Sequence, residues 1–258
     1  MHMVTNSEGV NRLAGAFCRI IVGAARAMRR FCQFAGALLA CILIAGTLFI
    51  GTVQATTEVT TDVTNDVMLP APLRLMVLGD SLVAGHGLPQ GQSFPDVLQA
   101  ELAKVGHVVE IFNAGVSGDT TAGGLARLEW SFAENPEALI IVLGGNDLLR
   151  GLDPAATSAN LSAIIDRARA RGIAVLLAGM QAPRNLGDDY ASEFDMIYQN
   201  LGARPDILYY PFFLEGVALV PEFNQADGMH PNLAGVKEIT SRILPTARKL
   251  LGKVRQDQ

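Results

Sequence analysis

Three residues of this chain have the side chains that acyl transfer requires. Ser81 offers an alcohol, His230 an imidazole, and Asp227 a carboxylate three residues before that imidazole. An alcohol becomes a nucleophile when a nearby base removes its proton, and imidazole is the side chain suited to this near neutral pH. A carboxylate that accepts a hydrogen bond from the second ring nitrogen orients the base. The pattern therefore predicts a catalytic site made of Ser81, Asp227 and His230.

The same chemistry needs N–H donors for the negative charge that develops on the carbonyl oxygen. The backbone N–H of Ser81 can supply one, because the residue lies at a strand-to-helix turn. Gly118 can supply another, because no Cβ blocks its N–H, and the Asn146 side chain offers an amide. Each of these residues taken singly is an ordinary helix cap or turn residue. Their combination favours an oxyanion hole.

Strand-like runs precede most of these residues. The predicted strands are Leu73–Leu78, Val108–Phe112, Ala138–Leu143, Ile173–Ala178 and Ile207–Tyr210. Their nearly continuous apolar character is typical of parallel strands that are covered on both faces. Chemistry in open α/β sheets lies at the carboxyl ends of the strands, so Ser81, Gly118 and Asn146 are expected at one edge of the sheet.

Helical patterns alternate with these strands. The predicted helices are Phe94–Val105, Thr121–Phe132, Pro154–Arg171, Tyr190–Leu201 and Pro231–Leu251. Asp153 is the expected N-cap of the third helix, and Pro245 is expected to kink or restart the last one. Alternating strands and helices predict one doubly wound α/β domain over residues 73–251, with a five-stranded parallel sheet.

Four blocks in this order resemble the SGNH (GDSL-type) hydrolase family, and together with neighbouring motifs they are most similar to its bacterial secreted arylesterase / thioesterase I / lysophospholipase L1 subgroup. The matching segments are Gly79-Asp80-Ser81-Leu82, Val116-Ser117-Gly118-Asp119-Thr120-Thr121, Gly124-Leu125-Ala126-Arg127-Leu128, Gly144-Gly145-Asn146-Asp147 and Asp227-Gly228-Met229-His230-Pro231. The resemblance implies a triad of Ser81, Asp227 and His230, and an oxyanion hole from Ser81, Gly118 and Asn146. It also implies the flavodoxin-like strand order 2-1-3-4-5, hydrolysis of esters and thioesters, no cofactor and no metal.

Apolar residues near these motifs are candidates for contact with an acyl chain. The expected substrate-lining residues are Leu148, Leu149, Leu152, Phe212 and Phe213. One position departs from the family pattern, because His86 stands where an aromatic residue is expected in many relatives. The departure bears on acyl-chain preference rather than on the triad.

Charge and cysteine usage restrict the possible partners. Beyond Ala55 the chain has 15 of its 20 Lys and Arg and 24 of its 25 Asp and Glu, a formal charge of −9. An acidic body argues against a nucleic-acid partner, so a small-molecule ester is the expected one. The three cysteines all lie in the first 41 residues, and the four histidines show no metal-ligand spacing. No metal and no cofactor are therefore expected.

The first 72 residues have the pattern of a leader and a tether. The uncharged run Phe31–Ile50 follows two arginines and precedes Ala55, which predicts a signal peptide cleaved after Ala55 and a periplasmic or secreted protein. The alternative is an inner-membrane anchor formed by the same run, which would be the chain's only membrane contact. Met28 is a possible true start. Residues 56–72 are expected to be a flexible linker and residues 252–258 a C-terminal tail.

The sequence thus favours a secreted serine esterase that acts through an acyl-enzyme on Ser81. Its expected substrates are aryl and short-to-medium acyl esters, with thioesters and lysophospholipids as further candidates. A carbohydrate O-acetyl esterase is the alternative within the same class of enzyme. A membrane-tethered binding domain without turnover is the alternative outside it. The ordinary α/β-hydrolase fold is disfavoured, because Val83 stands where its Gly-x-Ser-x-Gly motif needs glycine.

Overall fold

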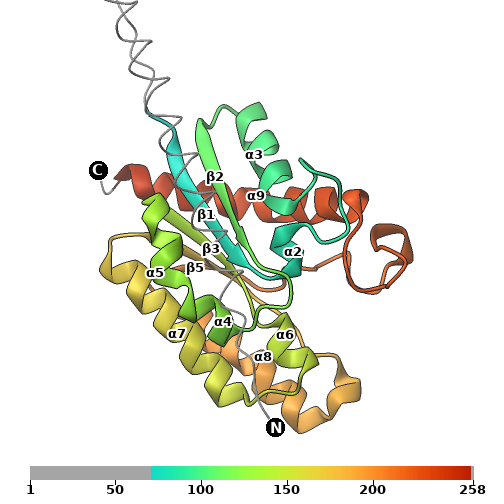
Figure 1. The fold of residues 1–258 in the computed structure, drawn as a ribbon. Coiled ribbons are helices and arrows are strands. Elements are labelled where there is room, and N and C mark those ends of the chain that lie inside the picture. The colour runs from blue at the N-terminus through green and yellow to red at the C-terminus, as the bar shows by residue number, and fades with distance from the viewer. Residues whose placement is uncertain (1–70, 257–258) are drawn as a thin grey trace, which may run out of the picture. The chain divides into compact units, whose positions relative to one another are not determined.

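The computed structural model describes residues 71–256, which contain one parallel β-sheet between two layers of helices (Figure 1). The strands are β1 (Leu73–Gly79), β2 (Val109–Gly115), β3 (Ala138–Val142), β4 (Ala174–Ala178) and β5 (Leu208–Tyr210). All neighbouring strands pair in parallel, in the order β2-β1-β3-β4-β5. The expected five-stranded sheet and its strand order are both confirmed, and the strand bounds differ from the expected ones by at most three residues.

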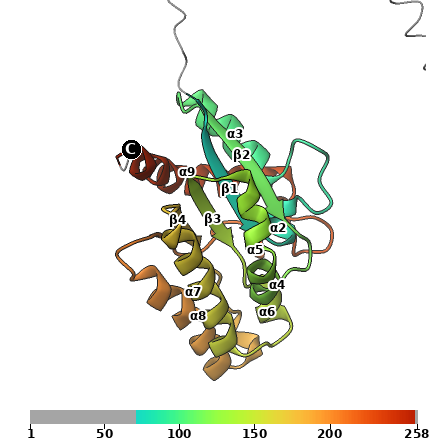
Figure 2. The same ribbon diagram turned by 60° about the vertical axis from the view of Figure 1, so that its left-hand side comes forward.

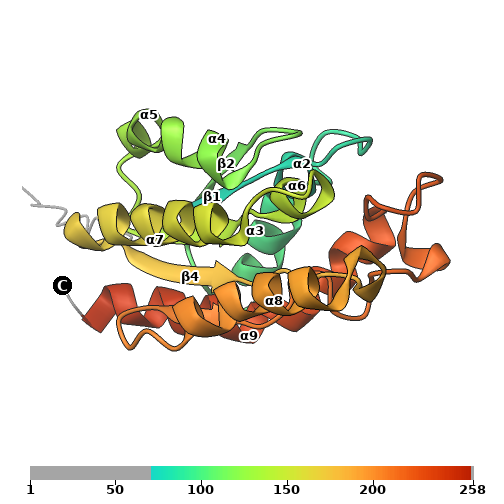
Figure 3. The same ribbon diagram turned by 90° about the horizontal axis from the view of Figure 1, so that it is seen from below.

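Helices cover both faces of the sheet. They are α2 (Ser81–Ala84), α3 (Phe94–Lys104), α4 (Thr121–Ala126), α5 (Leu128–Ser131), α6 (Gly145–Leu149), α7 (Pro154–Ala170), α8 (Asp188–Gly202) and α9 (Leu233–Gln256). Helices α3 and α9 pack together on one face, while α7 lies between α4 and α8 on the other (Figures 2 and 3). This arrangement follows from right-handed crossovers between parallel strands.

The core lies on both sides of the central strands. Every residue of β3 and β4 is buried, and in β1 only Arg74 is partly exposed. Strand β2 is an edge strand and is only half-buried along its length. The buried strands therefore fix the carboxyl edge of the sheet, from which the loops with the candidate residues extend.

The helix expected over Thr121–Phe132 is wrong, because the structure divides it at Arg127. Helix α4 ends at Ala126, α5 runs only from Leu128 to Ser131, and a 3-10 turn follows at Phe132–Glu134. Arg127 adopts φ −98° and ψ 2°, which is not helical. Its side chain is held by two partners outside the helix, described below, and these contacts override the local helical pattern.

The last helix also differs from its expected bounds. It begins at Leu233 and continues to Gln256 with Pro245 inside it, so it does not restart at the proline. Residues 252–256, expected as part of a tail, belong to this helix. Buried Leu250, Leu251 and Val254 continue its apolar stripe against the core, which accounts for the extension.

Asp153 caps α7 as expected, because its carboxylate accepts a hydrogen bond from the N–H of Ala155 at 2.9 Å. The predicted leader, the anchor alternative and most of the linker lie outside the described residues. Within residues 71–256, no helix combines the length and the apolar character needed to cross a membrane.

Candidate active site

Three side chains from opposite ends of the described chain form a continuous hydrogen-bonded series. Nε2 of His230 lies 2.9 Å from Oγ of Ser81, and Nδ1 of His230 lies 2.7 Å from Oδ2 of Asp227. In the tautomer with a proton on Nδ1, the serine hydroxyl donates to Nε2 and Nδ1–H donates to the carboxylate. This is the arrangement in which a histidine can remove the serine proton. The structure brings the three predicted residues together, and their catalytic roles stay predictions.

Ser81 owes its position to the short helix α2 at the carboxyl end of β1. Asp80 caps this helix, because its Oδ1 accepts a hydrogen bond from the N–H of Leu82 at 3.0 Å. Ser81 is the first residue of the helix, so its own N–H has no partner in the helix. Both the hydroxyl and the N–H of Ser81 are thereby available at the same edge of the sheet.

Asp227 is held by the backbone that follows it. Its Oδ1 accepts hydrogen bonds from the N–H of His230 at 3.0 Å and from the N–H of Met229 at 2.9 Å. The backbone N–H of His230, followed by its ring N–H, lowers the pKa of Asp227 well below its usual range. The carboxylate therefore stays ionised and opposes the positive charge that forms on His230 during proton transfer.

The candidate oxyanion donors come from the loops after β2 and β3. Gly118 has a φ of +85°, a conformation that glycine adopts without strain. Within residues 71–256 its N–H has no hydrogen-bond acceptor. Asn146 lies in α6, where one N–H of its amide donates to Oδ2 of Asp80 at 3.0 Å. The second N–H of the same amide can then serve as a donor to a substrate oxygen.

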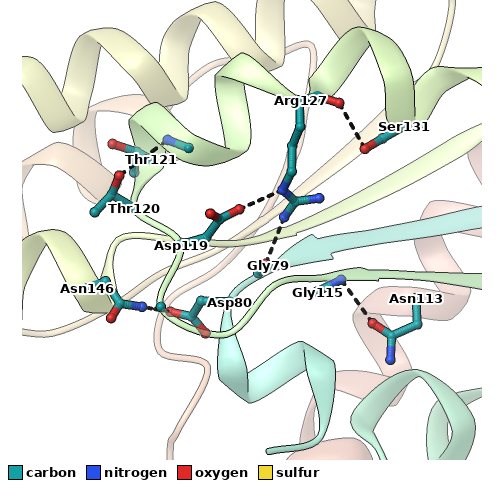
Figure 4. A network of polar contacts seen from close by, with 12 residues as sticks. Gly79, Asp80, Asn113, Gly115, Asp119, Thr120, Thr121, Arg127, Ser131 and Asn146 are labelled. Atoms are coloured by element: carbon teal, nitrogen blue, oxygen red, sulfur yellow. Dashed lines mark hydrogen bonds and ion pairs between the residues drawn. The ribbon is translucent and has the colours of Figure 1, made fainter. Parts of the chain in front are cut away.

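Arg127 ties the loop that carries Gly118 to the strand that precedes Ser81 (Figure 4). Its Nε donates to Oδ2 of Asp119 at 2.6 Å, and its Nη2 donates to the carbonyl of Gly79 at 3.0 Å. The two charged side chains are less than one-fifth exposed. Such a partly buried ion pair has a fixed geometry, so it holds the loop after β2 against the end of β1.

Two further contacts hold α6, the helix that carries Asn146. Nη2 of Arg150 donates to the carbonyl of Gly118 at 2.7 Å, which links the two loops with oxyanion donors. Buried Asp147 accepts hydrogen bonds from the N–H of Thr121 at 2.8 Å and from its hydroxyl at 2.6 Å. Asp147 therefore anchors α6 on α4.

Asp80 is a buried ionisable group next to Ser81. Its residue is 2 % exposed, and this burial raises its pKa from 3.8 to about 6. Hydrogen bonds from Leu82 and Asn146 act in the opposite direction but are outweighed. A folded-state pKa above the unfolded value means that the folded protein binds this proton more tightly. Stability from Asp80 is therefore present at low pH and is lost as the pH rises through about 6.

We expect Asp80→Asn to remove this pH dependence. The shift predicts that the unfolding free energy of the wild type, relative to Asp80→Asn, falls by about 2 kcal/mol from about pH 4 to about pH 7. Chemical denaturation of both proteins across this range measures the difference, and other carboxylates such as Asp227 cancel in it. If the unfolding free energies of the wild type and Asp80→Asn differed by a constant amount from about pH 4 to about pH 7, the raised pKa of Asp80 would be contradicted.

The five expected substrate-lining residues fall into two groups by exposure. Leu148 is 8 % exposed and Phe213 is 1 % exposed, so both pack in the core. Leu149 is 61 % exposed and Leu152 is 38 % exposed, while Phe212 is half-buried. The exposed pair lies three and six residues after Asn146 in the chain. Leu149 and Leu152 are thus the two exposed members of the set, and contact of any of the five with an acyl chain stays a prediction.

Several residues that build the site were not assigned such a role from the sequence. Arg127 was noted only as part of a family motif, and Arg150 and Gln225 were not singled out. A single arginine or glutamine gives no local signal in the sequence, because the partners of its side chain are distant in the chain. His86 gave a signal as a departure from the family pattern, and its ring packs on that of His230 with centroids 4.6 Å apart.

Among residues 71–256, no group of three or more His, Cys, Asp or Glu is arranged to hold a metal ion.

Comparison with known proteins places this chain among ester hydrolases. The model of the GDSL-like lipase/acylhydrolase family matches residues 77–237. The esterase TesA of Pseudomonas aeruginosa is 44 % identical over 178 residues, which are 69 % of this chain and 89 % of the relative. The arylesterase of Vibrio mimicus is 40 % identical over 61 % of this chain and 80 % of its own. Thioesterase 1/protease 1/lysophospholipase L1 of Escherichia coli K12 is 38 % identical over 61 % of this chain and 75 % of its own.

Solved structures agree with these relatives. The crystal structure of TesA has a TM-score of 0.65 at 44 % identity and covers 69 % of this chain and 99 % of its own. The crystal structure of AlinE4, an SGNH-hydrolase family esterase, has a TM-score of 0.60 at 45 % identity and covers 71 % of this chain and 98 % of its own. The range matched by the family model, residues 77–237, contains Ser81, Gly118, Asn146, Asp227 and His230.

Proposed function

The chain belongs to the GDSL-like lipase/acylhydrolase family and is an ester hydrolase, and we propose that it acts through an acyl-enzyme formed on Ser81. The observation that carries this proposal is the series of two hydrogen bonds from Ser81 through His230 to Asp227. A hydroxyl that donates to an imidazole held in this way is activated for attack on a carbonyl carbon.

In the first half of the reaction, Oγ of Ser81 passes its proton to Nε2 of His230 and forms a bond to the carbonyl carbon of the substrate. The carbonyl oxygen becomes an oxyanion and accepts hydrogen bonds from the N–H groups of Ser81, Gly118 and Asn146. Asp227 stabilises the imidazolium without taking its proton. When the tetrahedral intermediate collapses, Nε2 gives the proton to the departing oxygen or sulfur, and the acyl group stays on Ser81.

In the second half, water takes the place of the alcohol or thiol that has left. Nε2 of His230 removes a proton from the water, whose oxygen attacks the acyl carbon. The second tetrahedral intermediate uses the same donors, and its collapse releases the carboxylic acid as Nε2 returns the proton to Oγ of Ser81. The cycle needs no group beyond the residues described.

Exposed leucines that follow Asn146 in the chain support acyl esters as the substrates. Leu149 and Leu152 follow Asn146 within six residues, and burial of each methylene of an acyl chain against such side chains contributes up to about 0.8 kcal/mol. The names of the relatives include arylesterase and thioesterase/lysophospholipase. We therefore propose aryl and acyl esters, with thioesters and lysophospholipids, rather than acetylated carbohydrates.

Covalent labelling tests the proposal directly. Oγ of Ser81 should attack the phosphorus of a fluorophosphonate and displace fluoride, while the hydroxyl proton passes to His230. The phosphonylated product mimics the tetrahedral intermediate. Intact-mass and peptide analysis should place the label on Ser81 and find none in Ser81→Ala. Ser117→Ala is the matched control, since Ser117 is an exposed serine beside Gly118 and its loss should leave labelling intact. Undiminished labelling or turnover in Ser81→Ala would refute the acyl-enzyme.

We also propose that the enzyme is exported. The uncharged run Phe31–Ile50, the two arginines before it and the small residue Ala55 support a cleaved signal peptide. The full-length protein can be expressed in a bacterial host, recovered and labelled. Its intact mass then identifies the first residue of the chain in the same experiment. A mass that begins at Thr56 is expected, whereas a mass that still includes residues 31–50 would contradict cleavage.

A further inference from the structure

The loop that carries the candidate base is built on side-chain amides. This segment, residues 211–232, connects β5 to α9 and is here called the histidine loop. Nδ2 of Asn224 donates to the carbonyl of Val217 at 2.7 Å and to that of Val220 at 2.8 Å. Nδ2 of Asn232 donates to two further carbonyls of the same loop. These two amides hold the histidine loop to itself.

Gln225 differs, because its amide reaches outside the histidine loop. Its Nε2 donates to the carbonyl of His86 at 2.7 Å and to the carbonyl of Pro231 at 3.0 Å. Its backbone N–H donates to the carbonyl of His230 at 2.7 Å. Gln225 thus binds the carbonyls of His230 and Pro231. Through the same side chain it also binds the turn at His86, which lies 139 positions earlier in the chain.

The turn at His86 and Gly87 contacts the short helix that begins with Ser81. The N–H of His86 donates to the carbonyl of Ser81 at 3.2 Å, where α2 ends, and the ring of His86 packs against the ring of His230. Gly87 follows in the left-handed region at φ +71°, and a Cβ on it would lie 2.1 Å from Oε1 of Gln225. The Gln225 side chain therefore occupies space that only a glycine leaves free. In Figure 1 the same segments lie side by side, with the connection before α9 next to α2.

Hydrogen bonds thus link Ser81 to His230 by a second route, in addition to their direct contact. In this second route, the N–H of His86 donates to the Ser81 carbonyl, and the His86 carbonyl accepts from the Gln225 side chain. The backbone N–H of Gln225 then donates to the carbonyl of His230. A reacting hydroxyl and base need this kind of support, because their residues are 149 positions apart and the histidine lies in a loop rather than in a helix or strand. We propose that Gln225 is a positioning residue, which sets the distance between Nε2 of His230 and Oγ of Ser81.

This role rests on the proposed acyl-enzyme mechanism and predicts a loss confined to the chemical steps. Gln225→Met keeps the length of the side chain and its packing on Gly87 but removes both amide donors. We expect kcat and the rate of fluorophosphonate labelling to fall together by about tenfold to a hundredfold, because small displacements of reacting groups have effects of this size. KM should stay within about threefold of the wild-type value, since no substrate contact is removed.

Asn224→Leu is the matched control. It removes two amide-to-carbonyl hydrogen bonds of the same kind from the adjacent, equally half-buried residue, but none of these bonds reaches the His86–Gly87 turn. We expect it to lower the melting temperature at least as much as Gln225→Met while kcat stays within about threefold of wild type. Gly87→Ala disturbs the same contact through its other partner, because the added Cβ would displace the Gln225 side chain. It should reproduce the loss in kcat and in labelling rate, even if Gln225→Met fails to fold.

The outcomes separate the positioning role from the proposed function. Wild-type kcat in folded Gln225→Met or in Gly87→Ala overturns the role of Gln225, and so does an equal loss of kcat in Asn224→Leu. Neither result affects the acyl-enzyme as long as Ser81→Ala is inactive and unlabelled. An active Ser81→Ala protein would instead refute the proposed function, and the positioning role with it.

Discussion

Replacement of His230 by alanine should reduce kcat by about 10⁴- to 10⁶-fold, the range seen when the base of a serine–histidine–aspartate site is removed. Among the described residues, the His230 imidazole is the hydrogen-bond partner of Oγ of Ser81, at 2.9 Å, and without it the hydroxyl proton loses this acceptor. The ring of His230 is not among the proposed substrate contacts, so KM should change little. Steady-state kinetics on an aryl ester, with thermal unfolding as a check of the fold, measures the effect.

His86→Ala provides the control for this experiment. It removes the neighbouring imidazole, whose ring lies 4.6 Å from that of His230, but keeps the backbone carbonyl that accepts from Gln225. We expect a change of at most about tenfold, because the base and its partners stay in place. A protein that tolerates His230→Ala but not His86→Ala would show that the other imidazole is the base, and the assignment of His230 would have to be abandoned.

The second large effect is expected at Asn146. Asn146→Ala should reduce kcat by about 10²- to 10³-fold, which is the usual consequence of losing one oxyanion donor in a water-excluded site. The amide is already oriented in the free enzyme, because one of its N–H groups donates to Asp80 at 3.0 Å. Since the oxyanion exists only along the reaction, the loss should appear in kcat and in kcat/KM alike, with KM nearly unchanged.

Asn160→Ala is the matched control for Asn146. Its amide also donates a hydrogen bond near α4, to the hydroxyl of Thr121 at 3.1 Å, but it lies on α7 and is not a candidate donor to the substrate. Kinetics of the two variants on the same thioester and aryl ester should therefore differ by at least about tenfold in kcat. Similar losses in both variants would mean that Asn146 acts only through the packing of α6.

Local patterns in the sequence were enough to predict the layers of this fold. The runs that became β3 and β4 are apolar throughout because both of their faces are buried, and the run that became β1 is apolar except for Arg74. Asp153 marks the start of α7. Strand order was predicted from the family resemblance alone. The hydrophobic pattern of a strand indicates which of its faces are buried, but it does not indicate which strands are neighbours in the sheet.

Predictions failed where long-range contacts compete with local propensity. The pattern around Arg127 is helical, yet the helix breaks there, because its guanidinium binds Asp119 and the carbonyl of Gly79 instead of solvent. Pro245 was expected to kink or restart α9, yet the helix does not restart there and continues to Gln256, while buried Val254 extends its apolar stripe. In both cases tertiary packing outweighs the preference of a single residue.

The sequence by itself determined which chemical groups are present: one serine after a buried strand, an aspartate and a histidine three residues apart, and amide donors after two other strands. Only the tertiary structure decided that they meet, that Asp80 becomes a buried carboxyl with a raised pKa, and that Gln225 joins the two loops on which proton transfer depends. The reason is physical. A side chain's identity is a local property, whereas its distance to a partner 149 residues away is set by how the whole sheet and its helices pack.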